Sequence, residues 1–367
     1  MKLFKRTLFA AAALAVMGCA ADTAGTASTA KAAASEADKE LMSAAQGVFK
    51  PLPTFEEMQK VRQVTPEQIK LGQALFYDPR LSADQQQSCN TCHNLATYGV
   101  DNQSFSKGVA GGFGGRNAPS VLNSSLFVAQ FWDGRAKDVE EQAGGPMLNP
   151  AEMAMPNEAA VEEVLRLIPG YKAMFDAAFP GQQQSITFQN ATAAIGAFER
   201  TLLTPTRFDS YLRGDASALT AAEKAGLKKF MDVGCTACHM GTGLGGEGYF
   251  KFGLVQGPYW KFTGSKKPDD GRFEVTKSED DKNVFRSPGL RNVARTYPYF
   301  HDGSVWDLEK AVDIMGQAQL GAKMSADDVK SITAFLNALT GDVPEAARTM
   351  PILPAAGPRT PHPEHHK

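Results

Sequence analysis

The sequence contains little cysteine, little histidine and no excess of charge of either sign. Its 367 residues include five cysteines and six histidines, and 38 lysines and arginines stand against 40 aspartates and glutamates. No run of lysine or arginine could follow a phosphate backbone, so nucleic acid is not an expected partner. With 43% hydrophobic and 21% charged residues the composition is globular, which excludes a fibrous or wholly disordered chain. At roughly 100–200 residues per domain, the length predicts about two domains.

The start of the sequence also lacks an apolar run long enough to span a bilayer. The run Leu8–Met17 is too short for a membrane helix and follows three basic residues, which is typical of an export signal over residues 1–18. The four residues that end at Cys19 resemble a lipobox, so a lipid anchor on Cys19 is expected. The alternative is an ordinary signal peptide cut near Ala20 or Ala21. Either reading exports the protein, and we expect it in the periplasm of a Gram-negative bacterium.

The other four cysteines form two copies of one motif, and no cysteine is left over for disulfides. The copies are Cys89-Asn-Thr-Cys92-His93 and Cys235-Thr-Ala-Cys238-His239. C-x-x-C-H is the attachment signature of c-type haem, because the two thiols can each bond one haem vinyl group and the next imidazole can bind the iron. Zinc ribbons and redox dithiols also use C-x-x-C pairs, and they are the alternatives. The histidine after each pair, in an exported protein, favours two covalent haems.

Helix signals surround both motifs. The predicted helices begin at the capping boxes of Thr65 and Thr220 and at Asn157 and Ser325; others are the run Ala191–Leu203 and the stripe Val305, Leu308, Val312 and Met315. Asp78-Pro79 is expected to end the first helix, and Gly341 is expected as the C-cap of the last. The order of helix, haem motif, loops and closing helix occurs twice. We therefore predict a mainly α-helical protein with two cytochrome c-like domains, each with one covalent haem.

The predicted division of the chain follows from composition. Residues 19–50 are rich in Ala, Ser and Thr without an apolar period and are expected to be a flexible tether. The N-terminal haem domain is predicted at 51–205 and the C-terminal haem domain at 206–343. A Pro- and His-rich tail at 344–367 is expected to be an extended arm. Its histidines His362, His365 and His366 are expected to be solvated rather than bound to a metal.

The chain resembles the bacterial di-haem cytochrome c peroxidases and the wider group that includes the MauG-type enzymes. The resemblance runs from about Pro51 to Gly341 and keeps the order and spacing of several segments around both haem motifs. These segments are Arg116–Asn123, Gln130–Arg135, Gly145–Met147, Glu152–Met153, Leu290–Val293 and Tyr297–Gly303. The resemblance implies an enzyme that reduces hydrogen peroxide to water with electrons from a small redox protein.

The resemblance implies that the C-terminal haem is the site of electron entry. Its axial ligands in the family are His and Met, and His239 and Met315 match these positions. On its own pattern, Met315 is a core residue of an apolar helical stripe. A thioether ligand raises the reduction potential of a haem. MauG-type proteins have tyrosine at this position, so Met315 favours a peroxidase.

The resemblance implies that the N-terminal haem is the peroxide site, with His93 as its proximal ligand. Glu152 and Gln142 match the distal acid and amide of the family. Cleavage of the peroxide bond requires a proton to move between the two oxygens, which a carboxylate can do while an amide orients the peroxide. Taken alone, Glu152 after Pro150 reads as a solvated charge at a helix start. Trp132 matches the tryptophan between the haems, where it assists electron transfer, and a packed core position is compatible with that.

Other matches concern calcium and the haem propionates. Asn117, Thr296 and Pro298 match the calcium site that the family has between its domains, built from an Asn oxygen, backbone carbonyls and waters. Four side chains are implied near propionates: Arg116, Arg286, Arg291 and His301. The resemblance also implies a homodimer. The predicted cofactors are therefore two haem c groups and Ca²⁺.

One segment departs from the family. Many members have a histidine in the loop between the first haem motif and Arg116, where it blocks the peroxide site until the other haem is reduced. The stretch 106–115 here contains no histidine, and Val109 stands about where one would be. We therefore expect peroxide to bind without reductive activation. The alternative is that a loop lysine or a tail histidine supplies the ligand. On the first reading the Gly-rich loop stays mobile without gating.

The sequence thus predicts a cytochrome c peroxidase. Its partners would be hydrogen peroxide and a small periplasmic donor, such as a cytochrome c or a cupredoxin, and it would contact a membrane only through Cys19. A di-haem electron carrier and a MauG-like oxidase of another substrate are the alternatives. A pure carrier predicts two six-coordinate irons and no rapid reaction with peroxide. A MauG-like oxidase predicts poor turnover with a cytochrome.

Overall fold

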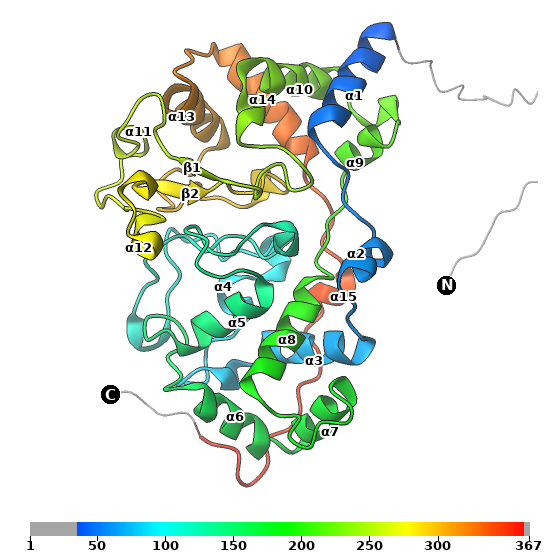
Figure 1. Cartoon of the computed structure of the whole chain (residues 1–367), viewed down its shortest axis with the longest axis vertical. Helices are drawn as coiled ribbons and strands as arrows, with labels where there is room; N and C mark the ends of the chain where they lie inside the picture. Colours follow the sequence, from blue (N-terminus) through cyan, green and yellow to red (C-terminus); the bar gives the residue numbers. More distant parts are fainter. Residues whose placement is uncertain (1–34, 363–367) are drawn as a thin grey trace, which may run out of the picture. The chain divides into compact units, whose positions relative to one another are not determined.

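The computed structural model describes residues 35–362, and this part of the chain is mainly α-helical, as predicted (Figure 1). These residues belong to one compact unit, and none of their helices is long and apolar enough to cross a membrane. The predicted export signal, Cys19, His365 and His366 lie outside the described residues. The helices are α1 (Glu36–Val48), α2 (Phe55–Val61), α3 (Pro66–Tyr77), α4 (Cys89–Cys92), α5 (Val139–Leu148), α6 (Glu158–Leu167), α7 (Pro169–Ala178), α8 (Phe188–Glu199), α9 (Arg207–Leu212), α10 (Ala221–Val233), α11 (Trp260–Thr263), α12 (Phe273–Thr276), α13 (Leu308–Leu320), α14 (Ala326–Ala338) and α15 (Glu345–Arg348), and the strands are β1 (Tyr249–Lys251) and β2 (Val284–Arg286).

Helices α3 and α8 pack against each other around the first haem motif (Figure 1). The predicted capping box of α3 is confirmed: the Thr65 hydroxyl accepts a hydrogen bond from the Gln68 N–H, and the Gln68 side chain accepts one from the Thr65 N–H. The helix ends at Asp78, as expected. Gly72 allows the close approach, because a Cβ at this position would collide with the backbone carbonyl of Ala194 on α8.

Helices α10 and α14 repeat this arrangement around the second haem motif. The predicted capping boxes at Thr220 and Ser325 begin the two helices. Here Gly226 is the residue of close approach, since a Cβ would collide with the backbone carbonyl of Ser331 on α14. The order of helix, haem motif and closing helix therefore occurs twice in the described residues, as the sequence predicted.

Buried side chains gather in three clusters. The first comes from α3, α5, α6, α7 and α8, and the second comes mainly from α1, α9, α10 and α14. The third surrounds the short antiparallel pair β1 and β2 and includes one face of α13. Val343 and Ala347, near the end of the chain, return to the first cluster. The predicted domain boundary near residue 205 remains a prediction.

The expected flexible tether is wrong for residues 35–50. Helix α1 begins at Ser35, whose hydroxyl accepts a hydrogen bond from the Asp38 N–H. Ala45 and Phe49 are fully buried in the second cluster. The Ala- and Ser-rich composition concealed a helical period of apolar residues, formed by Leu41, Met42, Ala45, Val48 and Phe49.

The C-terminal tail is not a free arm over its described part. It forms α15 and then runs along the first cluster, where the Tyr77 hydroxyl donates a hydrogen bond to the Ala347 carbonyl at 2.8 Å. Further along, the Thr360 hydroxyl donates to the Leu167 carbonyl at 3.0 Å. Proline lacks an N–H, but its segment keeps carbonyl oxygens and apolar rings that can dock on a neighbouring surface. His362 is exposed, as expected.

Two other helix predictions need correction. The run Ala191–Leu203 is helical only to Glu199, and α8 starts earlier, at Phe188, because Thr187 provides the N-cap. Gly341 is not the C-cap of α14, since the helix ends at Ala338. Instead the Gly341 N–H donates to the Asn292 side chain at 2.9 Å in a tightly packed turn. The predicted start of α6 at Asn157 is confirmed.

Candidate active site

The first C-x-x-C-H motif lies on the wall of a cavity. The single turn α4 begins where the Ser88 N–H donates a hydrogen bond to the Thr91 hydroxyl at 2.9 Å. The turn brings Cys89, Cys92 and His93 to one wall. This space, here called the first cavity, has a volume of ≈ 820 Å³. A volume of that size is typical of a cofactor site.

The cysteines of both motifs are partly buried, and their pKa values are raised. All four cysteines are free in the structure. Burial raises the pKa of Cys92 and of Cys235 to about 11, and it also raises the pKa values of Cys89 and Cys238. Redox dithiols depend on a thiolate with a lowered pKa. The raised values therefore disfavour the redox-dithiol alternative and fit cysteines that await covalent attachment.

His93 lines the first cavity with a lowered pKa. Burial lowers its pKa, an effect that Asp101 and the backbone near Gly99 and Pro119 partly offset, so the imidazole is neutral, the form that binds a metal. Its Nδ1 atom is buried and forms no hydrogen bond of ordinary geometry in the described residues. Buried polar atoms are rarely left unpaired without a reason. These residues fit a haem attached at the first motif.

The second motif lines another cavity, here called the second cavity, with Cys235, Cys238 and His239 on its wall. The His239 Nδ1 atom lies 3.2 Å from the Leu244 carbonyl oxygen. A hydrogen bond donated there leaves Nε2 with the free lone pair, which is how metal-binding histidines are held. Met315, on α13, lines the same cavity. The structure thus brings the predicted His and Met ligands together.

Glu152 and Gln142 both line the first cavity with His93. Gln142 lies on α5, and Glu152 lies in the turn that follows this helix. The Asn149 side chain donates a hydrogen bond to Glu152 Oε1 at 2.9 Å. Burial raises the pKa of Glu152, although the Arg135 charge and the Asn149 hydrogen bond oppose the shift. A carboxyl with a raised pKa can accept and return a proton closer to neutral pH.

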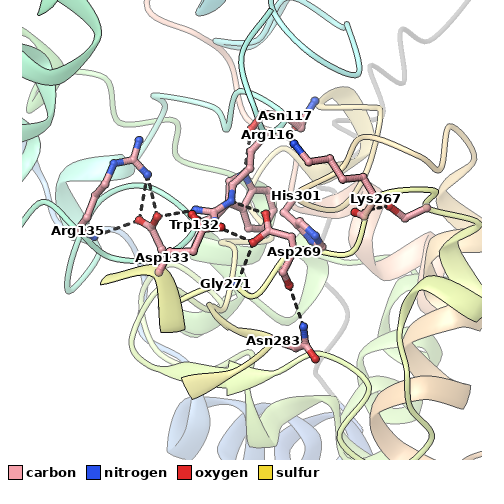
Figure 2. Close-up of polar contacts among 12 residues, drawn as sticks. Arg116, Asn117, Trp132, Asp133, Arg135, Lys267, Asp269, Gly271, Asn283 and His301 are labelled. Carbon is pink, nitrogen blue, oxygen red and sulfur yellow. Dashed lines mark hydrogen bonds and ion pairs between the residues drawn. The ribbon is translucent and has the colours of Figure 1, made fainter. Parts of the chain in front are cut away.

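Trp132 forms part of the wall between the two cavities. It lines both of them, as do Asn117 and His301. Its Nε1 donates to the Asn117 carbonyl at 2.9 Å, and its ring lies edge-on to the His301 ring with centroids 6.2 Å apart (Figure 2). The tryptophan predicted to lie between the haems is therefore fixed at a shared wall.

Comparison with known proteins gives the family of this site. Residues 66–217 match the family described as di-haem cytochrome c peroxidase. The cytochrome c551 peroxidase of Pseudomonas aeruginosa is 49% identical over 320 residues, which cover 87% of this chain and 91% of that protein. The chain belongs to the di-haem cytochrome c peroxidase family. It is therefore an enzyme of the cytochrome c peroxidase class, and membership implies two haem c groups.

Two further similarities show the breadth of the di-haem cytochrome c peroxidase family. The methylamine utilization protein MauG of Methylorubrum extorquens is 35% identical over 311 residues, which cover 80% of this chain and 84% of that protein. A crystal structure described as a MauG-like protein associated with microbial copper homeostasis matches with a TM-score of 0.69 and 30% identity. That match covers 86% of this chain and 96% of the solved chain.

The loop that lacks the family's histidine packs against Glu152, the expected distal acid. The Val109 N–H donates to the Glu152 carbonyl at 2.8 Å. The Val109 side chain is buried and is not part of the cavity wall, whereas Gly108 is. Lys107 is exposed and also absent from the wall. Among described histidines, only His93 and His301 line the first cavity.

Arg116 lines the first cavity of the peroxidase but is committed to carboxylates. It donates to Asp269 through Nε at 2.6 Å and to Asp133 through Nη1 at 2.5 Å (Figure 2). Burial disfavours its charge, but Asp269 and Asp133 raise the pKa of Arg116 above its ordinary value. Arg291 is likewise paired, with Asp209. Arg286, on β2, is 3% exposed and bonds only backbone carbonyls, and burial lowers its pKa to about 10.

Arg286 therefore suits a haem propionate better than Arg116 does. A buried guanidinium without a carboxylate is costly unless another anion neutralises it. Arg286 lines the second cavity beside Trp132. The resemblance implied Arg286 only as one of several residues near propionates. The ion pairs of the folded chain distinguish it, because Arg116 and Arg291 are bound to carboxylates and Arg286 is not.

The three expected calcium residues of the peroxidase, Asn117, Thr296 and Pro298, all contribute to the wall of the second cavity. The Asn117 side-chain N–H donates to the Gln103 carbonyl at 2.8 Å, which leaves its oxygen available. Within residues 35–362, no group of three or more His, Cys, Asp or Glu side chains is arranged to hold a metal ion. The calcium assignment stays a prediction because it depends on carbonyl oxygens and waters.

The sequence analysis missed one acid of the first cavity, Glu199 at the end of α8. It is 3% exposed and lines the cavity together with Cys89. A signal was present in the sequence, because Glu199 falls on the apolar stripe of this helix, eight residues after Ala191 and four after Ile195. Because Arg200 follows directly in the sequence, Glu199 and Arg200 resemble an exposed pair of opposite charges.

Proposed function

We propose that this peroxidase reduces hydrogen peroxide to water at the first cavity, with electrons that enter at the second. The observation that carries the proposal is that His93, Glu152 and Gln142 all line the same cavity. A haem bound at Cys89 and Cys92 would supply a redox-active iron with one open position. An acid, an amide and a proximal imidazole around such a position are the groups that peroxide cleavage requires.

The distal residues have separate roles in this proposal. The Glu152 carboxylate would accept a proton from one peroxide oxygen and return it to the other, which leaves as water. Two electrons from the donor and two protons from solvent would convert the remaining oxygen into a second water. The Asn149 N–H at 2.9 Å from Oε1 holds the carboxylate in one orientation. The Gln142 amide orients the peroxide and stabilises the charge that develops as the bond breaks.

The second cavity is the proposed site of electron entry. His239 and Met315 would bind its haem iron, and a thioether ligand suits a high-potential electron acceptor. Trp132 would shorten the electron path, since its ring belongs to both cavity walls. The proposed donor is a small redox protein such as a cytochrome c or a cupredoxin.

We further propose that peroxide binds to the fully oxidised enzyme. Support comes from the loop 106–115, in which Val109 carries no ligand atom, and from the positions of the other histidines. The His301 Nε2 atom is already hydrogen-bonded to the Tyr259 hydroxyl at 3.1 Å. His362 is exposed. Among the histidines of residues 35–362, these features would leave an iron at His93 without a distal imidazole.

The remaining proposals rest on the resemblance and the sequence. They are a calcium ion at Asn117, Thr296 and Pro298, a homodimer, two cytochrome c-like domains divided near residue 205, and a periplasmic location with a lipid on Cys19. A MauG-like oxidase is the competing function, in keeping with the similarity to MauG proteins. Met315 on the second cavity wall favours the peroxidase.

The test is rapid mixing of the fully oxidised, haem-loaded enzyme with hydrogen peroxide, followed by haem absorption. A fast spectral change supports a peroxidase that is open at rest. A change that needs prior reduction of one haem would mean that another group caps the iron. Steady turnover with a reduced cytochrome or cupredoxin separates a peroxidase from a MauG-like oxidase, and the absence of any reaction would leave only an electron carrier.

A further inference from the structure

Glu199 is a buried acid that the proposed peroxide reaction does not use. It is 3% exposed and lines the first cavity together with Cys89 and Cys92. Within residues 35–362 its carboxyl group has no hydrogen bond and no ion pair, and only longer-range charge effects from Glu140 and Arg200 reach it. An isolated carboxylate in a protein interior is costly, so such a group tends to hold a proton.

The nearest cation is already neutralised. Arg200 donates through Nε to Glu140 Oε1 at 2.8 Å and through Nη2 to Oε2 at 2.9 Å. Arg62 adds a second positive charge 3.4 Å from Glu140. Burial raises the pKa of Glu199 to about 8; the Glu140 charge adds to this shift and Arg200 opposes it. Glu199 therefore changes its protonation state near pH 8.

Glu140 and Arg200 are the charged groups that shift the pKa of Glu199. Helix α3 faces α8 with apolar residues. The turn at Ser124 presents a hydroxyl that has no partner in the described residues. From α4, the Cys89 thiol is close enough that Glu199, after burial, raises its pKa. Haem attachment converts this thiol into a thioether, which does not titrate, and joins the haem to the wall where Glu199 lies.

We propose that Glu199 binds and releases the proton that balances the charge of the first haem when that haem gains or loses one electron. The inference rests on the proposed attachment of a haem at Cys89, Cys92 and His93. One electron from the donor enters the haem, and one solvent proton forms an O–H bond on the Glu199 carboxylate. On oxidation this O–H bond breaks and the proton returns to solvent.

The physical reason is the low dielectric of the cavity. An added electron makes the neighbourhood more negative and favours the neutral acid over the carboxylate. Glu152 lies on the same wall but differs, because the Asn149 hydrogen bond and the Arg135 charge stabilise its ionised form. In this proposal Glu152 transfers the proton of the peroxide, and Glu199 determines how the haem potential depends on pH.

The test is a spectroelectrochemical titration of the haem-loaded enzyme over a range of pH values that extends to both sides of pH 8. In the natural protein we expect the potential of the first haem to fall as pH rises, by at most about 59 mV per pH unit for one proton per electron. Glu199→Gln, which is nearly isosteric, is expected to remove most of this slope. Glu199→Asp, which restores a carboxyl, is expected to retain it.

Two controls accompany the titration. The potential of the second haem, read in the same samples, should keep its own pH dependence in all variants. Glu163→Gln, at a position on α6 where the side chain is 60% exposed, should leave the slope of the first haem unchanged. An unchanged slope in Glu199→Gln, or no slope in the natural protein, would overturn the proposal. Failure of the same samples to react with peroxide would overturn the proposed function while the slope still reported on Glu199.

Discussion

At the scale of single residues, Glu152 carries the first prediction. Glu152→Gln keeps the shape and the Asn149 contact but cannot accept a proton. We expect the rate of the peroxide reaction to fall by about 10²–10⁴-fold, the usual contribution of a positioned acid–base group. Stopped-flow mixing with peroxide measures this rate. Both haem spectra should stay unchanged before mixing, and Glu163→Gln should react at the natural rate; a natural rate in Glu152→Gln would remove this carboxyl from the mechanism.

The acidity of the same residue gives a second prediction. Burial raises the pKa of Glu152 above its ordinary value of 4.5, and the Arg135 charge opposes that rise. The carboxylate that accepts the peroxide proton is lost as pH falls through this raised pKa, so the reaction should slow on acidification above pH 4.5. Arg135→Gln removes the opposing charge, so the decline should begin at a higher pH. A pH profile of the stopped-flow rate that is identical in the natural protein and Arg135→Gln would contradict this.

At the scale of secondary-structure elements, Gly72 and Gly226 lie at equivalent close contacts of two helix pairs and can be tested together. Gly72→Ala and Gly226→Ala each push a methyl group into a backbone carbonyl of the facing helix. Overpacking of this kind costs about 1–3 kcal/mol. Gly47→Ala, on α1, meets no atom within 4 Å and should be neutral or slightly stabilising, because alanine favours helix. Denaturant midpoints of the haem-loaded proteins measure the difference, and equal midpoints in all three variants would refute the close-packed crossings.

The start of α9 supplies a second prediction at this scale. Asp209 and Arg291 form a buried pair at 2.8 Å, and Asp209 also accepts hydrogen bonds from the N–H groups of Leu52 and Thr206. Burial opposes its charge, yet these partners lower its pKa below 3.8. Its stabilisation is therefore present above pH 3.8 and is lost as pH falls through the lowered value.

Asp209→Asn leaves Arg291 buried without a counter-charge, which costs about 3–5 kcal/mol. Urea unfolding at neutral pH measures the loss, and the variant should be less sensitive to acid than the natural protein. Asp232→Asn removes an exposed pair with Lys228 and should change little. If both variants lost a similar free energy of unfolding, the buried pair would contribute no more to stability than an exposed one.

At the scale of the whole molecule, features that depend on neighbours in the sequence can be predicted, whereas features that depend on tertiary contacts cannot. Caps and motifs depend on neighbours in sequence, so Thr65, Thr220 and both C-x-x-C-H sites could be predicted. Helix α1 could not, because its apolar stripe makes sense only against the second cluster. Whether a charge is free or paired also depends on distant residues. Arg116 meets Asp269 across a separation of 153 residues, and no local pattern records that contact.

The last prediction concerns communication between the two haem sites. We proposed that the oxidised enzyme binds peroxide because Val109 has no ligand atom. Val109→His then restores a nitrogen ligand to the loop that is hydrogen-bonded to the Glu152 carbonyl. The imidazole would compete with peroxide for the iron until reduction at the second site displaces the loop. We expect the oxidised variant to react slowly with peroxide and the half-reduced variant to react at the natural rate.

Val109→Leu controls for bulk at this buried position, since leucine has no ligand atom, and should react in both states. Electron paramagnetic resonance of the oxidised samples should show a low-spin first haem in Val109→His alone. If Val109→His reacts like the natural protein, a histidine in this loop is insufficient to close the site. The backbone bond from Val109 to Glu152 would then be the constraint that keeps the loop from reaching the iron, because it fixes the loop to the distal acid itself.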